Sequence, residues 1–180
     1  MKITILALGS HGDVQPFVAL GMGLQSAGYD VCIAANALFE TFVRNYGLGF
    51  FPIPLSTKKV FESKEGKAGL DSGRNAVNSF RNIARAFNLM VLTAGAECLR
   101  ACQGADVIIN TTGSLFFGPS IAKKLNLPHI GAFLQPQHST RTFPGLFSPI
   151  QRNLGGFLNR FTRFLTDIML WQPFRSAHNQ

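Results

Sequence analysis

The residues best placed to do chemistry lie near the start of this sequence, where Gly9-Ser10-His11-Gly12-Asp13 follows a short apolar run. The two glycines allow a ligand to approach the backbone closely. The free N–H groups of a helix that begins here attract anions, so the run predicts a phosphate-binding loop. It is not a P-loop, because Gly12 is followed by Asp13 and not by Lys.

A nicotinamide-dinucleotide site is disfavoured by the same residues. That site needs the spacing G-x-G-x-x-G and an acid at the end of the second strand. Here the spacing is G-x-x-G, and the second predicted strand runs into Asn36. Asp30 begins that strand and lies too far from the position of a ribose.

Asp13 has two interpretations. An aspartate suits the N-terminus of a helix as a capping residue. A carboxylate at the mouth of a sheet is also suited to act as a general base that takes a proton from an acceptor hydroxyl. An anionic diphosphate nearby would raise its basicity.

The elements that position this loop alternate between strands and helices. Strands are predicted at 3–8, 30–35, 49–53, 105–110 and 128–133. Helices are predicted from a first turn at Pro16 to Gly28, and at 37–46, 74–102, 116–125 and 150–176, with a mobile loop at 54–73. This alternation predicts an α/β, Rossmann-like parallel sheet with helices on both faces. Ligands should meet the loops 9–13, 111–114 and 135–142 and the segment after Ile53.

Composition excludes several other classes. Hydrophobic residues make up 46% and charged residues 14% of the 180 residues, which is too apolar for disorder. The formal charge of +8 suits an anionic partner. No RNA-binding, zinc-finger or basic-zipper pattern is present, so nucleic acid is disfavoured. The first strand is too short for a signal peptide and no apolar stretch of ~20 residues exists, so a cytoplasmic protein is expected.

The three cysteines predict no disulfide framework. Cys98 and Cys102 are spaced i, i+4, but a zinc site would need further ligands nearby. Cys32, Cys98 and Cys102 are therefore expected to be reduced thiols, and no metal is expected.

Four segments resemble one enzyme family. They are 9–21, 24–34, 47–53 and 134–144, the last reading Leu-Gln-Pro-Gln-His-Ser-Thr-Arg-Thr-Phe-Pro. The first resembles the opening of the GT-B glycosyltransferases that glucosylate sterols and glycopeptide or macrolide antibiotics. The last resembles a loop of the sterol glucosyltransferase branch.

This resemblance implies a two-domain enzyme in which residues 1–180 form the N-terminal, acceptor-side domain. The C-terminal donor domain, which binds most of the UDP-sugar, is not within this chain, so the chain alone is expected to be inactive. The family mechanism is a single displacement that inverts the anomeric centre without a metal. Asp13 would be the base, and Ser10, His11, Gly12 and Asp13 would contact the donor. Arg is usual in the family where this chain has His11, which could bind phosphate as a cation or share the proton transfer.

Other polar residues are candidates for the acceptor. Thr112 and Ser114 follow the fourth strand, where hydroxyls serve either a ligand or ordinary turn chemistry. Gln135, Gln137 and His138 follow the fifth strand and either position an acceptor hydroxyl or form a solvated loop.

Two Phe-bearing regions, 74–90 and the C-terminal helix, fit an acceptor groove, a peripheral membrane contact or a core stripe. The function predicted is transfer of a hexose, expected to be glucose, to a lipophilic alcohol such as a sterol. The alternatives are a non-catalytic acceptor- or membrane-binding half, or another nucleotide-binding Rossmann enzyme.

Overall fold

The computed structural model describes residues 1–54, 94–115, 117–145, 152–165 and 168. The chain divides into two compact units. Unit 1 comprises Met1–Val60 and Leu89–Leu134, and unit 2 comprises Phe61–Asn88 and Gln135–Gln180. Each unit is described by itself.

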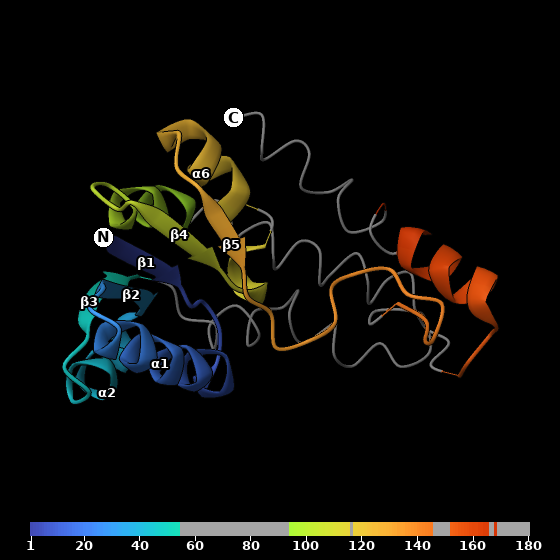
Figure 1. The fold of residues 1–180 in the computed structure, drawn as a ribbon, viewed down its shortest axis with the longest axis horizontal. Coiled ribbons are helices and arrows are strands. Elements are labelled where there is room, and N and C mark those ends of the chain that lie inside the picture. The colour runs from blue at the N-terminus through green and yellow to red at the C-terminus, as the bar shows by residue number, and fades with distance from the viewer. Residues whose placement is uncertain (55–93, 116, 146–151, 166–167, 169–180) are drawn as a thin grey trace. The chain divides into compact units, whose positions relative to one another are not determined.

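Unit 1 is built on a five-stranded parallel sheet in the order β3-β2-β1-β4-β5 (Figure 1). The strands are β1 (Lys2–Leu6), β2 (Asp30–Asn36), β3 (Gly49–Ile53), β4 (Val107–Asn110) and β5 (His129–Gly131). Ile5 pairs with Ile33 of β2, and Leu6 pairs with Asn110 of β4. The predicted α/β class and the parallel sheet are confirmed.

The central strand β1 is buried from Ile3 to Leu6 because both of its faces are covered. Ile3 and Ile5 pack on one face with Val14 and Phe17 of the following helix. Thr4 points to the other face, because side chains alternate along a strand. Its hydroxyl there donates to the carbonyl of Ala101 at 3.3 Å.

The helices lie on both faces of the sheet. In unit 1 they are α1 (His11–Ser26), η1 (Ala37–Phe39), α2 (Glu40–Arg44), η2 (Thr112–Ser114) and α6 (Gly118–Leu125). Residues 94–101 are also helical, as are 156–165 in unit 2. Figure 1 shows α1 and α2 on one side of the sheet and α6 on the other. Among the described residues, no helix is long and apolar enough to cross a membrane.

Several predicted boundaries are corrected. Helix α1 begins at His11, so Pro16 lies in its second turn and only Gly9 and Ser10 remain as loop. The predicted helix at 37–46 is a 3-10 turn followed by the short α2. The predicted loop 54–73 falls almost wholly outside the described residues, as does most of the helix predicted for 74–102.

Candidate functional site

The chain order of the sheet reverses between β1 and β4. From β1 the chain proceeds to β2 and β3 on one side, whereas β4 and β5 extend the sheet on the other. Ligands of open parallel sheets bind at such a switch point, outside the carboxyl ends of the strands. The segments that leave this point are the loop after Leu6 and the turn after Asn110.

These two segments are in direct contact. A Cβ added to Gly113 would overlap the carbonyl oxygen of Leu8, so the turn η2 lies against the loop after β1. The hydroxyl of Thr111 donates to the carbonyl of Leu6 at 2.8 Å. The loop that leaves β1 and the predicted loop 111–114 are therefore brought together at the switch point.

The Asp13 carboxylate is half-buried in the first turn of α1. Its Oδ2 accepts hydrogen bonds from the backbone N–H of Ser10 at 2.7 Å and from the Ser10 hydroxyl at 2.8 Å. This is one half of a capping box, in which an acidic side chain at the third helical position accepts a hydrogen bond from the backbone N–H of the N-cap residue. Its Oδ1 receives no hydrogen bond from the residues that the structure describes.

Ser10, His11 and Gly12 flank this carboxylate at the surface. All three are exposed, and Ser10 is the N-cap of α1. The first N–H groups of a helix have no partner within it, so His11 and Gly12 present theirs outward. The Ser10 N–H, by contrast, is already bonded to Asp13.

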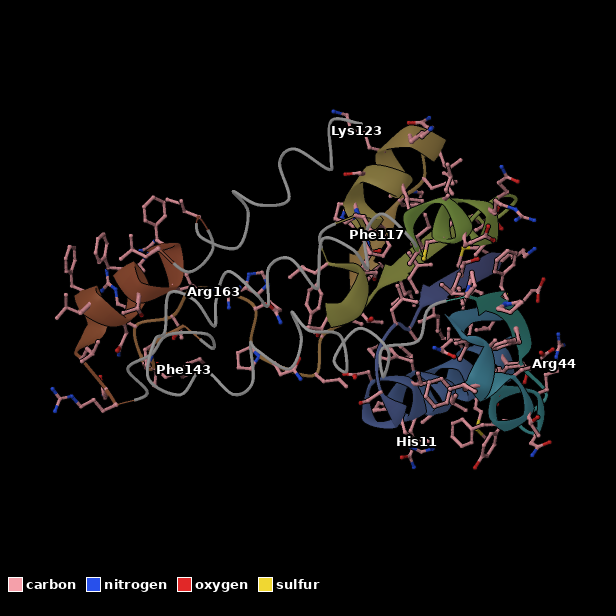
Figure 2. All side chains as sticks on the ribbon, turned by 180° about the vertical axis from the view of Figure 1, so that it is seen from behind. His11, Arg44, Phe117, Lys123, Phe143 and Arg163 are labelled. Carbon is pink, nitrogen blue, oxygen red and sulfur yellow. The ribbon has the colours of Figure 1, made fainter. Side chains whose placement is uncertain are left out.

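The His11 side chain, labelled in Figure 2, extends from the first residue of α1. It lies against aromatic rings of the neighbouring helical segment. Its ring centroid lies 4.9 Å from that of Phe42 and 6.0 Å from that of Phe39. Both phenylalanines follow β2, at the same carboxyl edge of the sheet. This aromatic support fixes the side of α1 on which the imidazole lies.

The predicted contact of Ser114 with the acceptor is disfavoured by the position of this residue in the turn η2. Its side chain is fully buried. Its oxygen accepts from the backbone N–H of Thr111 at 2.9 Å, and its hydroxyl donates to the carbonyl of Leu6 at 3.2 Å. Ser114 therefore joins η2 to β1. Thr112, the next candidate in this turn, is half-buried, and its acceptor role stays a prediction.

Asn110 is a buried polar residue that the sequence analysis did not single out. It ends β4 beside Leu6, and only 2% of its surface is exposed. Both polar atoms of its amide lack a hydrogen-bond partner among the described residues. A Cβ on Gly118, the first residue of α6, would overlap its Oδ1. The sequence feature that could have identified Asn110 is an asparagine at the end of the otherwise apolar strand β4.

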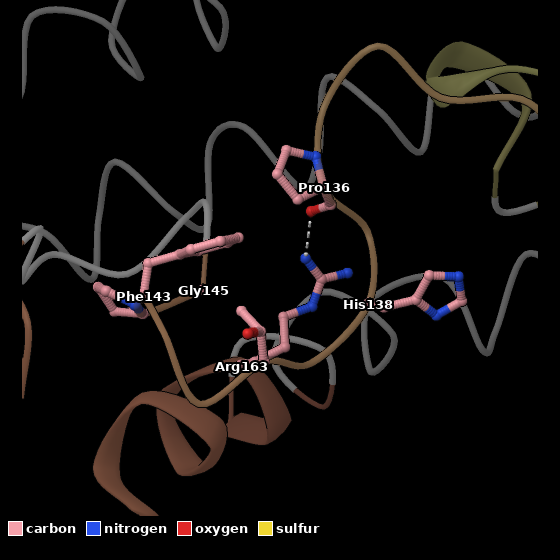
Figure 3. A pocket seen from close by; sticks show the side chains of 7 residues that line it. Pro136, His138, Phe143, Gly145 and Arg163 are labelled. Atoms are coloured by element: carbon pink, nitrogen blue, oxygen red, sulfur yellow. Dashed lines mark hydrogen bonds between the residues drawn. The ribbon is translucent and has the colours of Figure 1, made fainter. Parts of the chain in front are cut away.

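The remaining predicted residues lie in unit 2. Gln135 and Gln137 are half-buried, whereas His138 is exposed. The buried Arg163 donates to the carbonyl of Pro136 at 3.4 Å (Figure 3). It also donates to Oε1 of Gln137 at 3.3 Å. Arg163, which the sequence analysis missed, therefore anchors this loop to the helix 156–165.

The environment of the cysteines disfavours the thiolate, which is the reactive form of the side chain. Cys98 and Cys102 are buried and free, as the sequence predicted. Burial raises the pKa of the Cys102 thiol to about 12, with a smaller contribution from Cys32, and burial also raises the pKa of Cys98. In the part of the chain that is described, no three His, Cys, Asp or Glu side chains converge as a metal site requires.

Comparison with protein families gives one match over most of the chain. Residues 3–144 match the glycosyltransferase family 28 N-terminal domain. The chain is 34% identical to a sterol 3-beta-glucosyltransferase of Candida albicans, over 99% of this chain and 11% of that protein. It is 32% identical to UDP-sugar-dependent glycosyltransferase 52 of Dictyostelium discoideum, over 100% of this chain and 10% of that protein. The chain thus spans about a tenth of the length of these relatives.

Solved structures show the same fold. The Streptomyces sp. SF2575 glycosyltransferase SsfS6 superposes with a TM-score of 0.61 at 28% identity, over 80% of this chain and 41% of that one. The Streptomyces nogalater glycosyltransferase SnogD superposes with a TM-score of 0.61 at 18% identity, over 99% of this chain and 41% of that one.

Proposed function

Because this chain belongs to the glycosyltransferase family 28 N-terminal domains, we propose that it is the acceptor-side half of an enzyme that transfers a hexose from a UDP-sugar to a lipophilic alcohol. A GT-B enzyme has a second domain, and the greater length of the relatives is consistent with one. Membership of this family disfavours the alternative of another nucleotide-binding Rossmann enzyme.

The observation that carries this proposal is the position of Asp13. Its carboxylate lies in the first turn of α1, directly after the loop that leaves β1 at the switch point, where a ligand of a parallel sheet binds. Two donors from Ser10 hold Oδ2, which leaves Oδ1 to accept a proton. A general base must have an oxygen or nitrogen free to accept the proton within hydrogen-bond reach, and only then does its pKa determine how well it works.

The proposed reaction is a single displacement. The acceptor oxygen attacks the anomeric carbon while its proton passes to Asp13, and the bond from that carbon to the diphosphate breaks. UDP leaves from the opposite face, so the anomeric centre inverts. No metal is needed in this proposal, because the helix N–H groups of His11 and Gly12 face the diphosphate, with Ser10 beside them as the N-cap of α1. Most of the donor contacts come from the other domain.

The acceptor class rests on resemblance and on chemistry. Sterol 3-beta-glucosyltransferases recur among the relatives, and we propose glucose and a sterol-like alcohol on that basis. Thr112, Gln135, Gln137 and His138 are proposed to contact the acceptor. A cytoplasmic protein with a peripheral membrane contact would meet such an acceptor where lipophilic alcohols reside.

The test uses the complete protein that contains this chain. UDP release from UDP-glucose is measured with and without a sterol acceptor, for the native protein and for Asp13→Asn. Loss of a general base lowers turnover by about 100-fold or more. Asp30→Asn is the matched control, because Asp30 is exposed at the opposite edge of the sheet. Near-native turnover by Asp13→Asn would rule out Asp13 as the general base. Absence of acceptor-dependent UDP release by the native protein would rule out the proposed sugar transfer.

The alternative function that is compatible with the same fold is a non-catalytic domain that binds the acceptor or a membrane. It predicts that the complete protein binds the acceptor with no sugar transfer. The same assay, read beside acceptor binding, separates the two.

A further inference from the structure

One side of the helix 156–165 holds the loop 135–145, which carries residues proposed to contact the glycosyl acceptor. Three polar residues of the helix, spaced i, i+3 and i+4 and therefore on the same side, make these contacts, namely Asn159, Thr162 and Arg163. The Thr162 hydroxyl oxygen accepts from the backbone N–H of Gly145 at 3.2 Å. The helix and the loop both belong to unit 2.

Asn159 fixes the middle of this loop. Its side chain is fully buried and donates to the carbonyl of Arg141 at 2.9 Å and to Oδ1 of Asn153 at 2.8 Å. Its own Oδ1 accepts from the backbone N–H of Leu154 at 3.0 Å. A Cβ added to Gly156 would lie 3.2 Å from the Cβ of Arg141, so the loop also packs closely against the start of the helix. The loop therefore has a defined path over the helix.

Arg163 determines how the amide of Gln137 is oriented. The arginine is 8% exposed, and its guanidinium donates to Oε1 of Gln137 at 3.3 Å and to the neighbouring Pro136 carbonyl at 3.4 Å. A guanidinium carries donors only, so the oxygen of the Gln137 amide faces it and the nitrogen is turned to the other side. That nitrogen, Nε2, is buried and has no hydrogen-bond partner among the described residues.

A buried amide nitrogen without a partner costs free energy, because it has given up its hydrogen bonds to water. A ligand oxygen that accepts from it recovers this cost, whereas a ligand without such an oxygen leaves the nitrogen unpaired. For this reason a buried donor distinguishes ligands by their oxygen atoms more sharply than an apolar surface distinguishes them by size.

Apolar surface lies beside the same arginine. Pro136 and Phe143 line a pocket together with Arg163 and His138 (Figure 3). Sites for small lipophilic ligands combine such surface with a few fixed polar groups that orient the ligand.

We propose that Arg163 is a positioning residue that orients the Gln137 amide, and that Nε2 of Gln137 donates to an oxygen of the glycosyl acceptor. The ligand class is a lipophilic compound recognised through an oxygen that accepts a hydrogen bond. This inference rests on the proposed function, which gives Gln137 a contact with the glycosyl acceptor. It adds which atom of Gln137 makes that contact and which residue holds the atom in place.

The test is ligand binding by the complete protein that contains this chain, without UDP-sugar. The two probes are cholestanone, whose ketone oxygen can only accept hydrogen bonds, and cholestane, which has the same carbon skeleton and no oxygen. The native protein should bind cholestanone about tenfold more tightly than cholestane, the effect of one hydrogen bond from a buried donor.

Gln137→Glu is the decisive variant. Its carboxylate keeps an oxygen for Arg163, and this charge-assisted contact should hold the loop as firmly as in the native protein. The carboxylate has no N–H, so binding of cholestanone should weaken about tenfold while binding of cholestane and the melting temperature stay unchanged.

Arg163→Lys tests the positioning role. A lysine ammonium does not reproduce the planar guanidinium, so the Gln137 amide should lose its fixed orientation and the preference for cholestanone should fall. Arg160→Lys is the matched control, because Arg160 is exposed on the same helix, and it should bind both probes as the native protein does. If Arg163→Lys does not fold, Gln137→Glu carries the test alone.

Four results would overturn the inference. They are a native protein with no preference for cholestanone, native-like binding of cholestanone by Gln137→Glu, equal weakening for both probes, and native-like preference in a folded Arg163→Lys. UDP release tests the proposed function separately. A native protein that transfers no sugar but shows the expected preferences contradicts only the reaction, whereas intact transfer without a preference between the probes contradicts only the role of Gln137.

Discussion

Ser10 donates both its backbone N–H and its hydroxyl to the same oxygen of Asp13, at 2.7 and 2.8 Å. One carboxylate oxygen therefore closes the first turn of α1, and the other is left for a second task. Gly9 makes this possible, since any Cβ there would collide with the Asp13 carboxylate. Capping and catalysis, two separate interpretations of the sequence, are compatible in one side chain.

Ser10→Ala should lower the free energy of unfolding by about 1 kcal/mol, because Asp13 loses one of its two donors. Urea denaturation measures this change. Ser26→Ala is the control on the last residue of the same helix, where the exposed hydroxyl donates only to the carbonyl of Met22. A change in the control as large as that in Ser10→Ala would contradict the special role of the first turn.

Ser114→Ala and Thr112→Ala should separate stability from acceptor binding. The buried Ser114 hydroxyl joins η2 to β1, so its loss should cost about 1–2 kcal/mol of stability and leave the KM for acceptor unchanged. Thr112→Ala should raise that KM in the complete protein. Steady-state kinetics beside urea denaturation checks both expectations, and the reverse pattern would refute the assignment.

Asn110→Ala and Asn159→Ala form a matched pair of buried asparagines. The side-chain amide of Asn110 makes no hydrogen bond with the residues that the structure describes, so its replacement should change stability by less than about 1 kcal/mol. Asn159 accepts from the Leu154 N–H and donates to two oxygens, so its replacement should cost about 2–3 kcal/mol. Equal losses in the two variants would show that the Asn110 amide is bonded in solution.

Gly113→Ala should destabilise the protein by about 2 kcal/mol, because the new methyl group meets the Leu8 carbonyl, which is backbone and cannot move aside. Gly95→Ala is the opposite control. Its methyl group meets open space in the helix 94–101, so stability should rise by about 0.8 kcal/mol. Thermal melting of both variants tests the contact between the two site loops.

Cys102 should make stability depend on pH in the alkaline range. Burial raises its folded pKa from an ordinary value of 9.0 to about 12, so the unfolded chain releases the proton first. This contribution to stability is complete below the unfolded pKa and is lost as pH rises from about 9 towards 12. Urea midpoints of the native chain and of Cys102→Ala at about pH 8 and about pH 10 measure it. Parallel declines in the two proteins would contradict it.

The sequence alone determined the class of fold. Continuous apolar runs such as Ile3 to Leu8 predict strands buried on both faces, and the predicted strand at 49–53 coincides with β3. These features are local, because the period of apolar residues and the glycines between elements act within a few positions. The run from Gly9 to Asp13 likewise predicted the family and the loop at the switch point.

Tertiary structure decided what individual polar residues do. The sequence could not show that Ser114 is buried against Leu6 or that helix 156–165 buries its polar side. Nor could it show that the buried Asn110 amide has no partner within the part of the chain that the structure describes. Each of these depends on partners far away along the chain or on a neighbouring element. The reason is physical, because the burial of an individual polar side chain depends on what packs over it, and residues distant in the sequence supply that covering.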